Sequence, residues 1–286
     1  MFVIIGYIFM CVCIFGAYAA HGGHLGVLWQ PSEIVIIFGG GLGALIVAYG
    51  GAPLKQVIKG LPLVFKGSPY GKAFYMDLFA LMFEILSKVR KEGLMSIEGD
   101  VENPEGSPLF SKYPSVAHDH HVVEFITDYL RLMVGGNLNA FEIENLMDVE
   151  IDTHHHESEV PAQAINKLAD GLPAFGIVAA VMGVVHTMGS LHLPPSELGK
   201  LIGAALVGTF MGILLAYGFV GPLATILEGR AADGTRVFQT IKVTLLASLN
   251  GYAPQVAVEF GRKALQGSIR PSFSELEEYV KSAKSK

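Results

Sequence analysis

The sequence is poor in charge and in cysteine. Asp, Glu, Lys and Arg make up 16% of its 286 residues, whereas soluble domains carry about 25%. Hydrophobic residues make up 51%, and the mean hydropathy is +0.46. Cys11 and Cys13 are the only cysteines; they lie two apart in an apolar run, so they point in different directions on a helix and exclude a disulfide framework. These values are typical of a membrane protein.

Several catalytic and binding patterns are also missing. The sequence shows no strand-like alternation, no glycine-rich phosphate loop after a strand and no repeat at solenoid spacing. No nucleophile is paired with a candidate general base. We therefore expect neither an enzyme nor a bound cofactor.

The apolar residues gather in four stretches long enough to cross a bilayer, which takes about 20 residues of helix. The stretches are 2–20, 33–49, 172–190 and 201–226. Ser32 and Ser196 are the predicted N-caps of the second and fourth spans. Asp170 is the predicted cap of the third, with Pro173 in its first turn, where a missing N–H costs little. The predicted fold class is an all-α membrane protein with four transmembrane helices in two hairpins and a large helical cytoplasmic domain.

Basic residues set the predicted topology. Segment 51–170 holds ten Lys and Arg and the tail holds nine, whereas the short connections between spans hold only Lys200. Because cytoplasmic loops are enriched in basic residues, we place both segments and both termini in the cytoplasm, in a bacterial inner membrane. The predicted domains are a hairpin in 1–50, a cytoplasmic helical domain in 51–170, a second hairpin in 171–226 and a cytoplasmic tail in 227–286.

The long polar segment is predicted to be helical. Apolar residues recur with a helical period from Phe74 to Val89, and Gly93 is the predicted end of that helix. Further helices are predicted over 118–134 and 139–157, and near the C-terminus after a Ser272 or Ser274 cap. The segment carries a net charge of −8, which argues against a nucleic-acid partner.

Two histidine clusters raise the possibility of a metal site. They are His118, His120 and His121, and His154, His155 and His156. A helical metal site needs an i, i+3 or i, i+4 pair, and only His118 and His121 have that spacing. Without a further ligand, a solvated polar face is the preferred interpretation, and no metal is expected.

A basic cluster is followed closely by an acidic one. Lys88, Arg90 and Lys91 precede Glu92, Glu98, Asp100 and Glu102, with Gly93 between them. One interpretation is a solvated helix end. The other is a docking surface that presents both signs of charge to a partner.

Small residues are dense in the last two spans. Gly176, Ala179, Ala180 and Gly183 lie in the third, and Gly203, Ala204, Ala205, Gly208 and Gly212 lie in the fourth. Such residues let helices approach closely. Their density favours packing between subunits over packing within one hairpin.

At this point the sequence resembles a known family. "ALVGTFMGILLAYGFVGP", "LPAFGIVAAVMGVVH" and "LNGYAP" followed by "VEFGRK" resemble the MotA family of flagellar motor stator proteins, within the MotA/TolQ/ExbB superfamily. The resemblance extends from the outer loop with "QPSE" to the "RPSFSELE" tail. It implies five copies around two MotB chains, whose membrane Asp binds the ion, and a cytoplasmic surface that pushes on the rotor protein FliG.

The resemblance also assigns residue roles. Arg90 and Glu98 match the charged positions that contact the rotor, and Glu150 is a weaker match. Along the ion pathway, Pro173 and Pro222 match the family's prolines and Thr209 matches its channel threonine. Ala180 stands where sodium-driven relatives usually carry Thr, which favours protons as the transported ion.

The depth of these residues fits that role. At about 1.5 Å per residue, Ala180 lies about 12 Å from the inner end of its span and Thr209 about 12 Å from the outer end of the next. No titratable group is expected at that depth, because Glu33 and Glu197 are placed at the outer ends of spans. The spans of this chain are therefore predicted to line the ion path without binding the ion themselves. The titratable group that binds the ion must come from another chain.

Three alternatives remain open at this stage. The chain could be a TolQ/ExbB-like energiser of another process, or a passive membrane scaffold for a cytoplasmic complex. A self-contained secondary transporter is disfavoured, because four spans without a membrane charge offer no substrate site.

Overall fold

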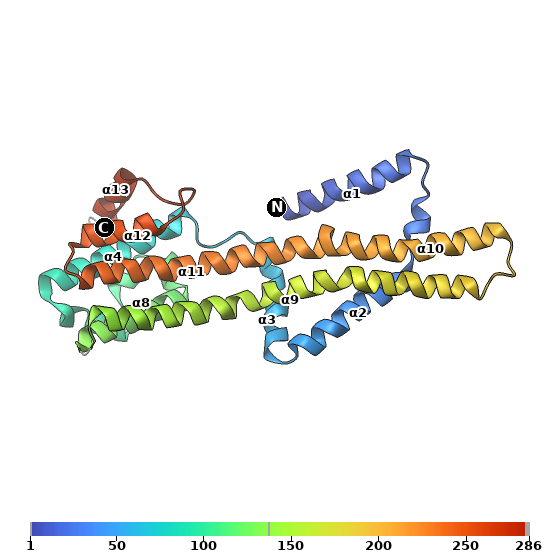
Figure 1. The fold of residues 1–286 in the computed structure, drawn as a ribbon. Coiled ribbons are helices and arrows are strands. Elements are labelled where there is room, and N and C mark those ends of the chain that lie inside the picture. The colour runs from blue at the N-terminus through green and yellow to red at the C-terminus, as the bar shows by residue number, and fades with distance from the viewer. Residues whose placement is uncertain (1, 137, 284–286) are drawn as a thin grey trace. The chain divides into compact units, whose positions relative to one another are not determined.

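The computed structural model of the chain describes residues 2–136 and 138–283, and all regular secondary structure in this part is helical (Figure 1). The chain forms two compact units. The first, which we call the membrane unit, comprises the chain up to Gly67 and Ser158–Gly229. The second, the polar unit, comprises Ser68–Glu157 and the chain from Arg230 onward. The all-helical prediction is confirmed.

The membrane unit holds the apolar helices. Its elements are α1 (Phe2–Ala20), η1 (Leu25–Leu28), α2 (Pro31–Tyr49), α3 (Ala52–Gly60), η2 (Leu61–Phe65), the second part of α9 (Ala140–Met188), α10 (Pro195–Ile213), the π-helix η4 (Leu214–Val220) and the start of α11 (Gly221–Leu249). Four helical stretches in the described chain are long and apolar enough to cross a membrane. This agrees with the prediction of four apolar helices that are candidates for membrane spans.

The helix starts differ from the prediction. Gln30 and Pro194 occupy the N-cap positions of α2 and α10, each followed by a proline at the first helical position. Proline is favoured there because its fixed φ suits the helix and its missing N–H is not needed. Ser32 and Ser196 therefore lie one residue inside their helices and are not caps.

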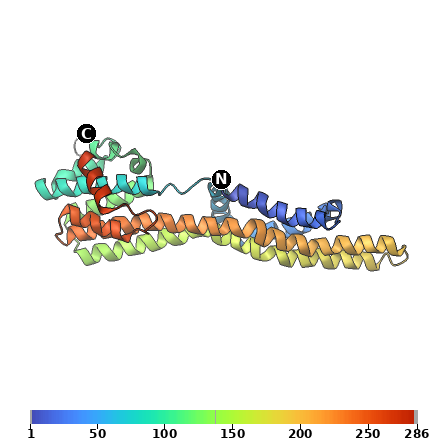
Figure 2. The same ribbon diagram turned by 90° about the horizontal axis from the view of Figure 1, so that it is seen from above.

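The third span is not a separate helix. The predicted helix over 139–157 and the third span are one element, α9, of 49 residues, which can be followed without a break in Figure 2. Asp170 therefore caps nothing, and Pro173 lies in a helix interior, as does Pro161. An interior proline removes one backbone hydrogen bond, and its ring crowds the carbonyl four residues before it, which loosens or bends the helix at that turn.

The polar unit is built from α4 (Lys72–Glu92), η3 (Leu94–Ile97), α5 (Glu98–Glu102), α6 (Pro108–Ser111), α7 (Pro114–Ala117), α8 (His120–Gly135), the first part of α9, the end of α11, α12 (Pro254–Ala264) and α13 (Phe273–Ala283). Gly93 ends α4 with a φ of +88°, as predicted. Ser272 and Glu275 form a capping box at α13, in which each side chain bonds the other's backbone N–H.

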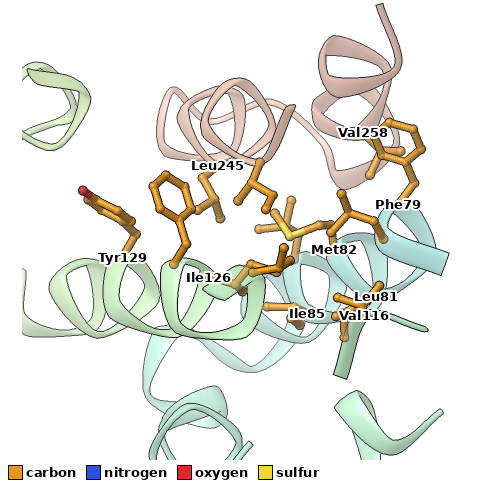
Figure 3. Close-up of a cluster of buried hydrophobic side chains, with 14 of the residues drawn as sticks. Phe79, Leu81, Met82, Ile85, Val116, Ile126, Tyr129, Leu245 and Val258 are labelled. Atoms are coloured by element: carbon orange, nitrogen blue, oxygen red, sulfur yellow. The ribbon is translucent and has the colours of Figure 1, made fainter. Parts of the chain in front are cut away.

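A single apolar core holds the polar unit together (Figure 3). Side chains from five helices meet in it, each at most 3% exposed: Phe79, Leu81, Met82 and Ile85 of α4, Val116 of α7, Ile126 and Tyr129 of α8, Leu245 of α11 and Val258 of α12. The helical period of α4 in the sequence thus identified the buried face correctly.

Small residues join α9 to α10 within one chain. A Cβ on Gly176 would lie 2.8 Å from the carbonyl oxygen of Gly208 and 3.1 Å from the Cα of Gly212. A Cβ on Gly183 would lie 2.7 Å from that of Ala205. The prediction of packing between subunits is therefore wrong for these positions, because the hairpin itself uses them. Gly203 has no atom of the described chain within 4 Å of such a Cβ.

Candidate functional site

The contact between α9 and α10 places Ala180 and Thr209, both predicted to line the ion pathway, at the same height along the two helices. A Cβ on Gly208 would lie 3.1 Å from the backbone nitrogen of Ala180 and 3.1 Å from the Cβ of Ala179. Thr209 follows Gly208 directly, so Ala180 and Thr209 flank the same close contact. Both side chains are half-buried.

The two prolines do not share a level. Gly176 of α9 packs on Gly212, and Pro161 and Leu227 both lie against Gly60. This antiparallel register puts Pro222 opposite residues near 165, about two turns or roughly 11 Å along α9 from Pro173. The glycine contacts therefore place the two prolines at different levels of the hairpin.

Pro222 lies next to an unusual helical segment. It is the second residue of α11, directly after the seven-residue π-helix η4. In a π-helix the backbone bonds reach one residue further than in an α-helix, and such segments are frequent at functional sites. Pro222 is exposed, whereas Pro173 is half-buried.

A buried carboxylate, missed in the sequence, lies beside the α9–α10 contact. Glu33 of α2 is 8% exposed, and its Oε2 has no hydrogen-bond partner in the described chain. That oxygen would lie 2.8 Å from a Cβ on Gly208. The expectation that no titratable group reaches this depth is therefore wrong. Only the helix register reveals this, since the sequence shows merely an acidic residue in a first helical turn.

The basic and acidic residues between Lys88 and Glu102 in the polar unit include both paired and unpaired charges. Lys88 bonds Asp100 at 2.8 Å, and Arg131 bonds Glu102 at 2.9 Å. Arg90, on the last turn of α4, and Glu98, at the start of α5, are exposed and have no ion pair or hydrogen bond in the described chain. A hollow of about 170 Å³ lies beside Arg90, lined by Phe83, Ser87, Lys91, Pro254 and Gln255.

Glu150 has a partner within the fold. Its Oε2 accepts a hydrogen bond of 2.6 Å from the Tyr129 hydroxyl, which joins α9 to α8. Burial, and then the Glu150 carboxylate, raise the pKa of that hydroxyl well above its ordinary value. The Glu150 side chain thus contributes to helix packing, unlike Arg90 and Glu98.

The two histidine clusters are divided among several helices. His118 follows α7 as its C-cap and His121 belongs to α8, so the predicted helical pair is wrong. In the described residues no group of three metal-ligating side chains comes together. His154 packs on Phe238 at 4.6 Å between ring centroids, and its burial lowers its pKa. The solvated-face interpretation holds for the exposed His118, His120, His121 and His156, but not for the half-buried His154 and His155.

Comparisons with known proteins agree along the whole chain. The motility protein A N-terminal family matches residues 4–93, and the MotA/TolQ/ExbB proton channel family matches residues 118–240. Motility protein A of Salmonella typhimurium is 53% identical, over 99% of this chain and 96% of that protein. Motility protein A of Escherichia coli K12 is 54% identical over the same shares. Chemotaxis protein LafT of Vibrio parahaemolyticus is 36% identical, over 96% of this chain and 97% of that protein.

Two solved structures share the fold. The MotAB structure of C. jejuni superposes with a TM-score of 0.77 at 20% identity, over 94% of this chain and 98% of that one. The flagellar MotAB stator complex of Bacillus subtilis superposes with a TM-score of 0.69 at 22% identity, over 96% and 98%. These likenesses support the helical architecture.

Proposed function

The chain belongs to the motility protein A family, and from this premise we propose that it works with MotB as the stator of a flagellar motor, in which ion flow drives rotation. It is a stator and ion-channel subunit and not an enzyme. The observation that carries the proposal is the 53% identity to a motility protein A over 99% of the chain.

The membrane unit supports a shared ion path. Ala180 and Thr209 flank the close α9–α10 contact, and we propose that this face lines the path together with a membrane carboxylate of MotB. Ala180 offers no hydroxyl to coordinate sodium, so protons are the proposed ion. Five copies around two MotB chains are the proposed assembly.

The polar unit supports a rotor contact. Arg90 and Glu98 project unpaired charges of opposite sign, as a docking surface for a charged partner requires, and FliG is the proposed partner. Glu150 is a secondary candidate, since its carboxylate is already bonded to Tyr129. The proposed location is the inner membrane, with both termini in the cytoplasm.

The test is complementation. The chain and its MotB would be expressed together in bacteria that lack their own stator genes, and swimming would be recorded with and without a protonophore. We expect swimming that stops with the protonophore and does not depend on external sodium. A cell that stays non-motile while both chains reach the membrane would refute the stator function.

The same cells separate the alternatives. A passive scaffold would keep its cytoplasmic complex assembled and active after the proton gradient collapses. A TolQ/ExbB-like energiser would restore a gradient-driven process other than swimming. Speed that follows sodium and survives the protonophore would refute protons as the ion, but would leave the stator function standing.

A further inference from the structure

We propose that the Glu33 carboxyl is a proton-binding group of this chain, placed level with Ala180 on the path that runs past Ala180 and Thr209. The inference rests on the proposed function, because it assigns a residue to that same ion path. It adds to the path a titratable side chain that belongs to this chain and not to its partner.

The position of Glu33 carries the proposal. Its side chain extends from α2 to the point where Gly208 of α10 meets Ala179 and Ala180 of α9. The absence of a Cβ at Gly208 makes room for the carboxylate, since a Cβ there would lie 2.8 Å from Oε2. Small residues on two helices and a glutamate on a third thus share one site.

The Glu33 carboxylate lies deeper in the membrane unit than its place in the first turn of α2 suggests. Gly208 is 13 residues from the first residue of α10, which is about 20 Å along the helix. Glu33, although in the first turn of α2, therefore lies well inside the outer end of the α9–α10 hairpin. It is level with Ala180 and one residue from the level of Thr209.

Nothing in the described chain neutralises the carboxylate. On the neighbouring helices of the membrane unit, the titratable groups include Lys55 and Lys59 on α3, Glu159, Lys167, Asp170 and His186 on the second part of α9, and Glu197 and Lys200 on α10, where the last two bond each other at 2.8 Å. None of them bonds Glu33. An unpaired carboxyl in a membrane segment is costly and is met chiefly where protons or ions are transferred. The N-terminal end of α2 stabilises the anionic form, so the site can hold either protonation state.

The first test labels the carboxyl directly. Dicyclohexylcarbodiimide reacts with a protonated carboxyl in apolar surroundings: the acid O–H adds across one C=N bond, and the O-acylisourea rearranges to a stable N-acylurea. We would treat the purified complex with MotB at several pH values and locate the adduct by mass spectrometry. We expect an adduct on Glu33 that declines as the pH rises and is absent from Glu33→Gln. The exposed Glu197 is the control that should stay unlabelled.

The second test measures proton-limited rotation. At low load, Glu33→Gln should slow the motor by about a hundredfold or more, since a positioned proton-transfer group typically contributes about 10²–10⁴-fold in rate, and the loss should grow as the external pH rises. Glu33→Asp should recover part of the speed and Glu197→Gln should match the wild type. A Glu33→Gln motor with the wild-type pH profile, or a complex that is never labelled at Glu33, would overturn the inference.

The two proposals fail separately. If the wild-type chain does not restore swimming but Glu33 is labelled as expected, the stator function fails and the proton-binding carboxyl stands. If the wild type swims and Glu33 is neither labelled nor needed for the pH profile, only the inference fails.

Discussion

Neighbouring charges in the polar unit have two different structural roles. Asp100 accepts hydrogen bonds from Lys88 at 2.8 Å and from the buried Ser107 at 2.7 Å, so this carboxylate joins α4, α5 and the start of α6. Arg90 and Glu98, close by in the sequence, are exposed and bonded to nothing in the described chain. The Asp100 charge therefore stabilises the fold, whereas the charges of Arg90 and Glu98 are available to a partner.

The first prediction tests this separation. Arg90→Glu should impair swimming without lowering the melting temperature of the purified chain, because an exposed charge acts on association and register. Lys88→Glu, its matched control two residues away, should lower the melting temperature, because it puts a like charge against Asp100. Normal swimming by Arg90→Glu combined with Glu98→Lys, with the rotor unchanged, would show that these charges are only a solvated face.

The second prediction concerns the pH dependence of α13. Hydrogen bonds from Lys72, and then from the backbone and hydroxyl of Ser272, lower the pKa of Glu275 to about 2. Because the folded-state pKa is depressed, the stabilisation is present above the ordinary value of 4.5 and is lost as the pH falls from there towards 2. α13 should therefore become easier to cleave by pepsin over this interval.

Glu275→Gln is the control for α13. The amide keeps the capping box with Ser272 but loses the charge that pairs with Lys72. The ratio of the wild-type cleavage rate to that of the variant should rise as the pH falls. A constant ratio would show that the Glu275 charge does not hold α13 in place.

At the scale of elements, direct contact between the backbones of α9 and α10 sets how closely the two helices pack. A Cβ on Gly212 would lie 2.8 Å from the carbonyl oxygen of Leu172 and 2.9 Å from the Cα of Gly176. Backbone atoms cannot rotate away as a side chain can, so the helices would have to separate. The close approach that aligns Ala180 with Thr209 depends on these glycines.

The third prediction follows from that contact. Gly212→Ala should destabilise the hairpin by about 1–3 kcal/mol, the usual cost of overpacking, and should reduce motor speed. Gly203→Ala, on the same helix, should have little effect, because no described residue has an atom within 4 Å of its added Cβ. Thermal melting of the two variants in detergent gives the comparison, and equal melting temperatures would contradict it.

The fourth prediction concerns the bend that a proline allows in α9. Pro173 has no N–H to offer the carbonyl of Ala169, so the helix is looser at this turn. Pro173→Ala should restore that bond, leave assembly intact and reduce rotation more than ion binding. Speed and proton uptake would be measured in the same cells, with Pro161→Ala, the other interior proline of α9, as the control. An equal loss from both variants would argue against a specific role for Pro173.

At the scale of the whole molecule, the basic residues predict how the chain crosses the membrane. Four helical stretches in the part of the chain that the structure describes are long and apolar enough to span it, and the polar segments carry 19 of the 20 Lys and Arg, with Lys200 the exception. Basic residues are retained on the cytoplasmic side. The long segment, the tail and the N-terminus should therefore share one side of the membrane.

The fifth prediction tests this topology. An alkaline phosphatase reporter, active only outside the cytoplasm, should be inactive when fused after Pro104 and active when fused after His24. A green fluorescent reporter at the same positions should give the reverse. If phosphatase activity appeared at Pro104 and not at His24, the proposed orientation of the chain would be wrong.

The sequence by itself determined the four apolar stretches, the buried face of α4 and the stop at Gly93, together with membership of the family, and it narrowed the cap of α13 to Ser272 or Ser274. These features depend on residues within a few turns of one another, so periodicity and local hydrogen bonding are enough to predict them. The continuity of α9, the separate levels of Pro173 and Pro222, the partner of Glu150 and the burial of Glu33 were decided only by the tertiary structure. They depend on the register between helices far apart in the sequence, and that register is set by glycine contacts such as Gly176 with Gly212, which no local pattern encodes.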